Sequence, residues 1–158
     1  MLVPLLTLAL TVVDQVSKTV VHTRFGLGES VPVLPGFFYL TYVRNTGAAW
    51  GMFAGYSGWL TLFSVVALVL IIVFRHRLID DSLRHRLAFA CMLSGVLGNL
   101  IDRLRYGYVI DFLDFHFGSY QYPVFNVADS AICIGAGLYL LDIFFNRHEP
   151  RLRKGGTA

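Results

Sequence analysis

The chain has 158 residues, of which 56% are hydrophobic and only 15% charged, with a formal net charge of +3. A soluble domain of this length would have close to a quarter of its residues charged, so the composition favours a membrane protein. The basic residues flank apolar runs and form no groove-sized patch, and no nucleic-acid partner is expected.

Four apolar runs are long enough, or nearly so, to cross about 30 Å of hydrocarbon at roughly 20 residues each. They cover residues 2–21, 58–74, 87–104 and 125–145. We expect the first to be a span and not a cleaved signal peptide, because it lacks a basic start and a small-x-small cleavage site. The prediction is a single integral-membrane domain over residues 1–158, an all-α membrane protein with four transmembrane helices.

Lys and Arg residues are distributed unevenly around these runs. Eight lie between the second and third runs or after the fourth: Arg75, Arg77, Arg84, Arg86, Arg147, Arg151, Arg153 and Lys154. The two remaining loops hold four: Arg24, Arg44, Arg103 and Arg105. Because cytoplasmic flanks are enriched in Lys and Arg, both termini are predicted to be cytoplasmic, with loops 22–57 and 105–124 outside.

Three acidic residues on separate apolar runs are predicted to lie at nearly the same depth in the membrane. With a rise of 1.5 Å per residue, Asp14, Asp102 and Asp129 lie about 10, 8 and 6 Å below the outer boundary of the hydrocarbon. Ionisable groups in membrane segments are costly, so a shared layer of them predicts a functional site near the outer leaflet.

Two of these acids follow an Asn by three residues: Asn99 precedes Asp102, and Asn126 precedes Asp129. Residues three apart share a helix face, so each amide can orient its carboxyl group. Two carboxyls about 3 Å apart hold a single proton between them. The ionised member can take a proton from water and the protonated member can give one to a leaving amine, which is chemistry suited to amide hydrolysis.

Small residues in the third and fourth runs would let these helices approach closely enough for the acids to meet. They are Ser94, Gly95, Gly98, Ala131 and Gly135. The chain has no H-E-x-x-H motif and no His/Cys cluster, so no metal and no cofactor are expected.

The first outer loop contains residues 38–43, a short run rich in aromatic and β-branched side chains that predicts a strand. A turn at 44–47 follows it. We expect a small extracytoplasmic sheet resting on the membrane and presenting Arg44 and Asn45 to a substrate.

The second outer loop carries Asp111 and Asp114 at a spacing of three, with aromatic residues at the same spacing. This pattern is typical of a short interfacial helix. We expect Asp111 to form a structural salt bridge with Arg103 or Arg105.

Other readings of single motifs stay open. Asp14 and Lys18 are spaced i,i+4, which suits either a self-neutralising ion pair or a functional pair. Residues 55–58 spell the G-x-S-G of membrane serine proteases, but no His lies within a span to act as its base. A Ser–Lys dyad of Lys18 with Ser17 or Ser130 is a further alternative.

Five blocks of the sequence, taken together, closely resemble those of the lipoprotein signal peptidase (bacterial signal peptidase II) family. In order, they are Asp14-Gln15 with Lys18, Arg44-Asn45-Thr46-Gly47-Ala48-Ala49, Gly98-Asn99-Leu100-Ile101-Asp102-Arg103, Val109-Ile110-Asp111-Phe112 and Phe125-Asn126-Val127-Ala128-Asp129-Ser130. The resemblance implies that Asp102 and Asp129 are the catalytic dyad. It also implies supporting or lining roles for Asp14, Lys18, Asn45, Asn99, Arg103, Asp111, Asn126 and Ala128.

The resemblance further implies an aspartic endopeptidase of the bacterial plasma (inner) membrane. Its substrates would be prolipoproteins whose Cys already bears diacylglycerol, cut just before that Cys, and globomycin would be expected to occupy the same cleft. A monomer among membrane lipids is the expected state. Two other functions remain: a proton-coupled carrier, against which the lack of charge near the midplane argues, and a non-catalytic binder of lipidated chains.

Overall fold

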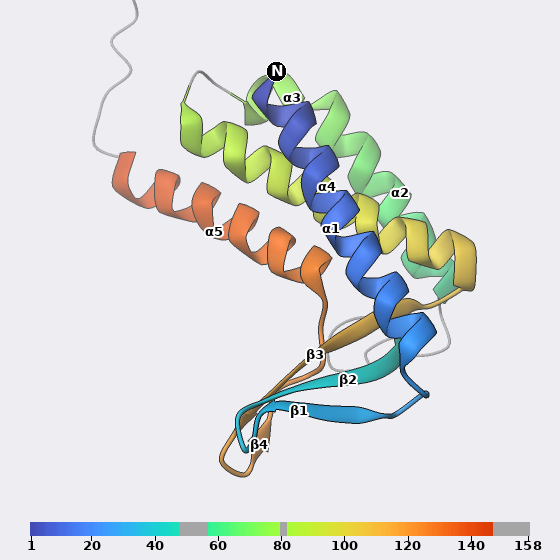
Figure 1. Cartoon of the computed structure of the whole chain (residues 1–158). Coiled ribbons are helices and arrows are strands. Elements are labelled where there is room, and N and C mark those ends of the chain that lie inside the picture. Colours follow the sequence, from blue (N-terminus) through green and yellow to red (C-terminus); the bar gives the residue numbers. More distant parts are fainter. Residues whose placement is uncertain (48–56, 80–81, 147–158) are drawn as a thin grey trace, which may run out of the picture.

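The computed structural model describes residues 1–47, 57–79 and 82–146. Its helices are α1 (Leu2–Arg24), α2 (Ser57–Val73), α3 (Arg75–Leu78), α4 (Leu83–Tyr106) and α5 (Val127–Asn146). Its strands are β1 (Ser30–Leu34), β2 (Phe38–Asn45), β3 (Val109–Phe117) and β4 (Tyr120–Gln121). The helices form a bundle, and the sheet lies at the end of the bundle opposite the N-terminus (Figure 1).

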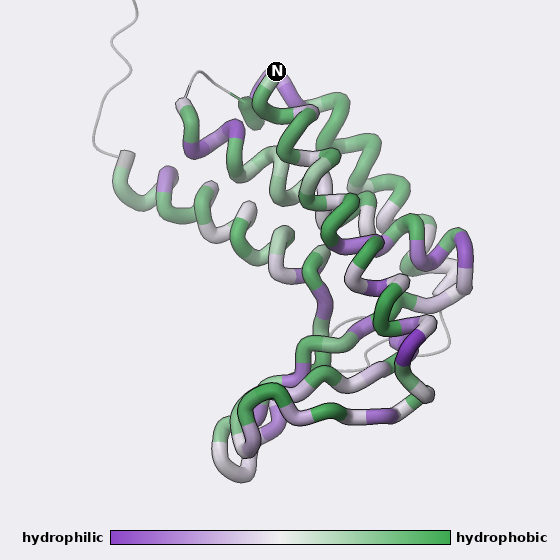
Figure 2. The backbone as a smooth tube through the Cα atoms, viewed as in Figure 1, coloured by the Kyte–Doolittle hydropathy of each residue, from purple (hydrophilic) through white to green (hydrophobic). Residues whose placement is uncertain are grey.

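Two of the described helices, α1 and α4, are long and apolar enough to cross a membrane. α2 is apolar but shorter, at 17 residues. The exposed face of α1 presents a stripe of Leu5, Leu8, Val12, Val16 and Val20 at helical spacing, which is a face suited to lipid. Figure 2 shows the same contrast between hydrophobic helices and a more mixed sheet. The four-span topology stays a prediction.

Helix α4 lies at the centre of the bundle and packs against α1, α2 and α5. Small residues allow its close approach to α5, as predicted. A Cβ at Gly95 would collide with the backbone oxygen of Ala128, and one at Gly135 would collide with Met92. Without these side chains the two backbones come close enough for van der Waals packing and polar contacts between helices.

The antiparallel sheet has the order β1-β2-β3-β4 and combines both predicted outer loops. The strand predicted at residues 38–43 is confirmed as β2, but the strand continues through Asn45, so the turn predicted at 44–47 is wrong for its first two residues. The helix predicted in the second loop is wrong, because β3 pairs with β2 in the register Asn45↔Val109 and Arg44↔Ile110. A run of β-branched and aromatic residues beside an available strand favours the sheet over a helix, despite the spacing of three between Asp111 and Asp114.

Side chains alternate in direction along β2 and β3, so the sheet has two different faces. On one face, Tyr42, Ile110 and Phe112 pack with Val21 of α1 in a buried hydrophobic cluster. On the other face, Asn45 and its partner Val109 lie beside Asp111 and line a cavity. The cluster thereby fixes the sheet against the helix ends, and the polar face is left for a site.

Candidate active site

Asp129 is held at the start of α5 by a reciprocal cap with Asn126. The backbone N–H of Asp129 donates to Asn126 Oδ1 (2.9 Å), and the backbone N–H of Asn126 donates to Asp129 Oδ2 (3.2 Å). This is the capping-box arrangement, with Asp in the position usually taken by Glu or Gln. The Asn-x-x-Asp spacing therefore marks a helix start here.

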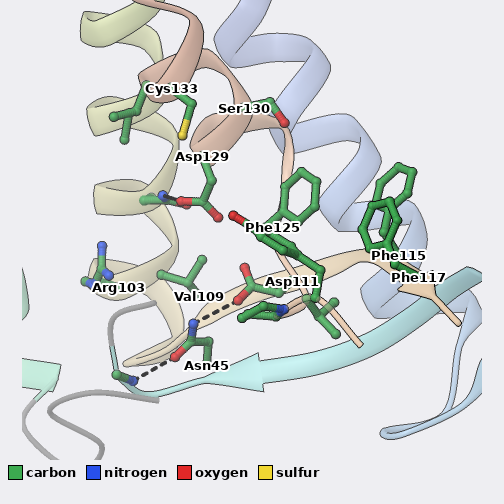
Figure 3. A pocket seen from close by; sticks show the side chains of 16 residues that line it. Asn45, Arg103, Val109, Asp111, Phe115, Phe117, Phe125, Asp129, Ser130 and Cys133 are labelled. Carbon is green, nitrogen blue, oxygen red and sulfur yellow. Dashed lines mark hydrogen bonds between the residues drawn. The ribbon is translucent and has the colours of Figure 1, made fainter. Parts of the chain in front are cut away.

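Asp111, on β3, lines the same cavity as Asp129. The two side chains reach this cavity from different elements, β3 and α5 (Figure 3). Asn45 donates to Asp111 Oδ2 (2.9 Å), and the side-chain amide of Asn126 donates to Asp111 Oδ1 (2.7 Å). Asn126 thus contacts both acids, one through its side chain and the other through its cap. The predicted salt bridge of Asp111 is absent from the described residues, where two amides take its place.

A third amide, Asn99, completes this arrangement. It donates to Asp129 Oδ1 (2.7 Å), and its oxygen accepts from Lys18 Nζ (2.9 Å) and from Asn126 (3.1 Å). Because an ammonium group can only donate, the contact with Lys18 fixes which end of the amide faces Asp129. The NH₂ group of Asn99 is therefore directed at the carboxyl of Asp129.

The environment of Asp111 raises the pKa of its carboxyl group well above the usual value. Burial raises the pKa of Asp111, and repulsion from Asp129 raises it further. Hydrogen bonds from Asn45 and Asn126 and the charge of Lys18 lower it, and the net pKa is about 7. A pair of neighbouring acids with one pKa in this range can hold a single proton at neutral pH.

Asp102 occupies a different environment. Its Oδ2 lies 3.0 Å from Lys18 Nζ and accepts from the backbone N–H of Ile110 (3.0 Å), while its Oδ1 accepts from Gln15 (3.0 Å). The side chain is only 1% exposed and is not among the residues that line the cavity in the described part of the chain. The acid that the structure brings to the cavity beside Asp129 is Asp111 and not Asp102.

The buried network around Lys18 connects three helices. Lys18 Nζ lies 3.0 Å from Asp14 Oδ2 as well as from Asp102, and Asp14 Oδ1 accepts from the backbone N–H of Ala128 (2.9 Å). The carboxyl of Asp14 fits against α4 because Gly98 has no side chain there. Of the two readings of the Asp14–Lys18 pair, this geometry matches the structural one, since it ties α1 to α4 and to the start of α5.

Gln15, which stands in the first of the five sequence blocks but is given no role there, is a further member of this network. Its side-chain NH₂ group donates to the backbone oxygen of Gly98 (3.1 Å) as well as to Asp102. A polar residue next to Asp14 within an apolar run was the available signal.

Arg44 and Asn45 are neighbours on β2 and therefore face opposite ways. Asn45 lines the cavity, whereas Arg44 donates from Nε to the hydroxyl of Tyr42 (2.9 Å) on the helix-facing side. Of the two residues expected to meet a substrate, only Asn45 reaches the cavity. Arg103 does line it, and its Nη1 lies 3.4 Å from Ser64 Oγ.

The cavity has a volume of about 580 Å³, with acids and amides at one end and apolar walls. Its apolar and aromatic lining consists of Val109, Phe115, Phe117, Tyr122, Pro123, Val124, Phe125, Ile132 and Cys133. A smaller cavity of about 330 Å³ lies between α2, α4 and α5 and shares Asn99, Arg103, Asp129 and Ile132 with the first. Asp129 thus borders an apolar space on each side, as suits an extended ligand with lipid-soluble parts.

The serine alternatives have other partners in the structure. The hydroxyls of Ser17 and Ser130 donate to backbone oxygens of their own helix region, Asp14 and Asn126 respectively. Ser57 donates to the backbone oxygen of Gly107, while residues 55 and 56 of its motif lie outside the described residues. Within the described ranges, no group of three or more His, Cys, Asp or Glu residues is arranged to hold a metal.

Known proteins are similar to this chain over most of its length. The model of the family described as "Signal peptidase (SPase) II" matches residues 6–145. The lipoprotein signal peptidase of Pasteurella multocida is 47% identical over 144 residues, covering 89% of this chain and 87% of that protein. The lipoprotein signal peptidase of Geobacter sulfurreducens is also 47% identical, over 143 residues, covering 89% and 88%.

Two solved structures have a similar fold. A bacterial membrane enzyme determined by the in meso method at 2.3 Å resolution superposes with a TM-score of 0.83 and 30% identity, covering 98% of this chain and 93% of that one. A second bacterial membrane enzyme, determined by the same method at 1.9 Å, gives a TM-score of 0.77 and 32% identity, covering 96% and 92%.

Proposed function

Because this chain belongs to the signal peptidase II family, we propose that it removes the signal peptide from diacylglyceryl-modified prolipoproteins, cutting just before the lipidated Cys. We further propose an aspartic mechanism in which the two acids are Asp111 and Asp129, in place of the pair Asp102 and Asp129. The observation that carries this assignment is Asn126, which contacts both Asp111 and Asp129 at the wall of one cavity.

The raised pKa of Asp111, about 7, favours it as the protonated member of the pair. Asp129, at a helix N-terminus, is the ionised member. Asp129 takes a proton from a water molecule as that water attacks the scissile carbonyl carbon, and Asp111 gives its proton to the carbonyl oxygen. The resulting diol then collapses: Asp129 gives its proton to the leaving nitrogen, the C–N bond breaks, and a diol proton returns to Asp111.

The remaining polar residues position this pair. Asn45, Asn99 and Asn126 hold the two carboxyls through the hydrogen bonds described above. Asp14, Lys18 and Asp102, together with the N–H of Ala128, keep the supporting helices in register. Arg103 lines both cavities and is available to a carbonyl oxygen of the substrate backbone.

We propose that the enzyme works as a multi-pass monomer in the bacterial plasma membrane, with its cavity near the outer leaflet. The spanning length of α1 and α4 and the apolar stripe on α1 support this setting. The apolar cavity walls would accommodate the lipidated part of a precursor, and globomycin would compete for the same space. No cofactor is required by this mechanism.

The test is cleavage of a diacylglyceryl-modified precursor by purified protein in detergent. Asp111→Asn and Asp129→Asn should each abolish product formation while the protein still folds and binds precursor. Asp102→Asn is the matched control, since it alters an acid of the Lys18 network; it should lower thermal stability and leave measurable turnover. Full activity of Asp111→Asn, or binding without product by the wild type, would refute the proposal.

A further inference from the structure

The exposed guanidinium of Arg44 is held in place although it makes no ion pair among the described residues. Its Nε donates to the Tyr42 hydroxyl (2.9 Å), and its central carbon lies 5.6 Å from the Tyr42 ring centroid and 5.0 Å from that of Tyr108. With Nε occupied in this way, the two terminal nitrogens of Arg44 remain available. A long side chain has therefore lost much of its freedom before any ligand arrives, which lowers the entropic cost of binding.

The same aromatic surface carries a second cation. Tyr108 stacks on Tyr106 with ring centroids 5.7 Å apart, and the guanidinium of Arg105 lies 5.2 Å from the Tyr106 centroid. On the inner side, His22 Nδ1 lies 2.6 Å from the Tyr42 hydroxyl. We call Arg44, Arg105, Tyr106 and Tyr108 the Arg44 cluster.

This cluster is positively charged without a neighbouring counter-ion. No carboxylate lies within 4.0 Å of Arg44 or Arg105 in the described part of the chain, and residues 48–56 contain no Asp or Glu. The acid of the adjacent loop, Glu29, is bound to the backbone N–H of Gly26 (2.7 Å). An anion at Arg44 would therefore meet no repelling carboxylate within that distance in the described part of the chain.

The ends of α1 and α4 nearest the sheet carry exposed leucines. Leu104, next to Arg105 in the last turn of α4, is 68% exposed, and Leu27, after the end of α1, is 63% exposed. Both lie at or just beyond the end of a helix that is long enough to span a membrane, at the end of the bundle that meets the sheet (Figure 1). Tyr side chains at a helix end are typical of the membrane interface. A free anion would contact only the guanidinium, whereas a phospholipid could contact the guanidinium through its phosphate and the leucines through its acyl chains.

We propose that the Arg44 cluster binds the phosphate of an anionic phospholipid at the outer surface of the membrane. The terminal nitrogens of Arg44 form the two-point contact that a planar guanidinium makes with phosphate oxygens. Leu104 and Leu27 contact the upper part of the acyl chains. This site is on the opposite face of β2 from Asn45 and stands independently of the proteolytic function.

The test uses the full chain in detergent micelles and native mass spectrometry to measure retention of dioleoyl phosphatidylglycerol, dioleoyl phosphatidylcholine and inorganic phosphate. We expect one phosphatidylglycerol to be retained in preference to phosphatidylcholine. Arg44→Gln should weaken its apparent affinity about tenfold or more, as expected for a lost two-point charged contact. Arg44→Lys, which keeps the charge but not the planar geometry, should give a smaller loss.

Arg77→Gln is the matched control. Its guanidinium also lies over a ring, 5.7 Å from the Phe74 centroid, but at the far end of α2. That change should leave the phosphatidylglycerol preference intact. Equal retention of the two lipids, displacement by equimolar inorganic phosphate, or equal losses in Arg77→Gln and Arg44→Gln would each overturn the proposal. Unfolding temperatures identify a folding defect in Arg44→Gln, in which case Arg44→Lys gives the result.

Discussion

Asn126 donates its side-chain amide to Asp111 across 2.7 Å, from the position that begins the helix carrying Asp129. One residue therefore sets the place of a strand acid through its side chain and of a helix acid through its cap. A displacement of α5 relative to β3 would break the contact, so the two acids keep their relation only while sheet and bundle stay docked.

The first prediction concerns this residue. Asn126→Ala should reduce turnover of a lipidated precursor by tenfold or more, because Asp111 loses a donor and Asp129 loses the oxygen that caps its helix. Loss of the cap should also lower the free energy of unfolding by about 0.5–2 kcal/mol. The hydroxyl of Ser82 caps α4 by accepting from the backbone N–H of His85 (3.1 Å). Ser82→Ala removes this cap and should lower the free energy of unfolding by a similar amount without loss of turnover. Equal turnover in both variants would contradict a positioning role for Asn126.

The second prediction concerns pH. The pKa of Asp111 is raised to about 7, and the proposed mechanism needs its protonated form, so kcat/KM should fall as pH rises through about 7. The hydrogen bond from Asn45 lowers this pKa, and Asn45→Ala should therefore move the falling limb to higher pH.

The pH profile has a matched control on the same strand. Thr41→Val removes a 2.6 Å hydrogen bond to Asp114, an acid that lies away from the cavity lining. Burial raises the pKa of Asp114, but hydrogen bonds, that from Thr41 first, outweigh burial and leave the pKa below its usual value. The falling limb should not move in Thr41→Val. A limb that shifts equally in both variants, or in neither, would remove Asp111 as the titrating acid.

The third prediction concerns the buried ion network. Lys18→Met leaves Asp14 and Asp102 buried without their cation and should destabilise the protein by about 3–5 kcal/mol, measured as the free energy of unfolding in detergent. The double variant Lys18→Met with Asp102→Asn should recover part of that loss, because one of the two uncompensated charges is gone. Additive losses in the double variant would show that the two side chains do not interact energetically.

The helices and β2 were predictable because their patterns are local. Apolar length identifies α1 and α4, and β-branched and aromatic residues identify β2. The prediction of a helix in the second outer loop was wrong because Asp111 and Asp114 are spaced as on a helix. The interaction that decides the structure is pairing with β2, more than sixty residues away in sequence. Local spacing carries no information about such a partner.

The depth of the candidate site along the helices was predictable from the sequence, but the direction in which each side chain points was not. Depth along α4 brings Asp102 to the level of Asp129, yet Asp102 turns toward Lys18, which lies at that same level on α1. A search confined to ionisable residues within spans excludes Asp111, because that residue lies in an outer segment. The signal that could have found it is a lone acid within the run Val109–Phe112, which is otherwise apolar and whose three apolar members are almost fully buried.

The last prediction concerns the fit between α1 and α4. A Cβ at Gly98 would collide with the Asp14 carboxyl, which is buried, bound to Lys18 and to Ala128, and unable to move without losing those partners. Gly98→Ala should therefore lower the unfolding temperature and the turnover together. Gly137→Ala on α5 is the matched control, since its Cβ meets nothing within 4 Å. Replacing a helical Gly at such a site should be neutral or stabilise by up to about 1 kcal/mol. If Gly98→Ala were as stable and active as Gly137→Ala, a methyl group would fit between α4 and the carboxyl of Asp14, and the close contact at Gly98 would be contradicted.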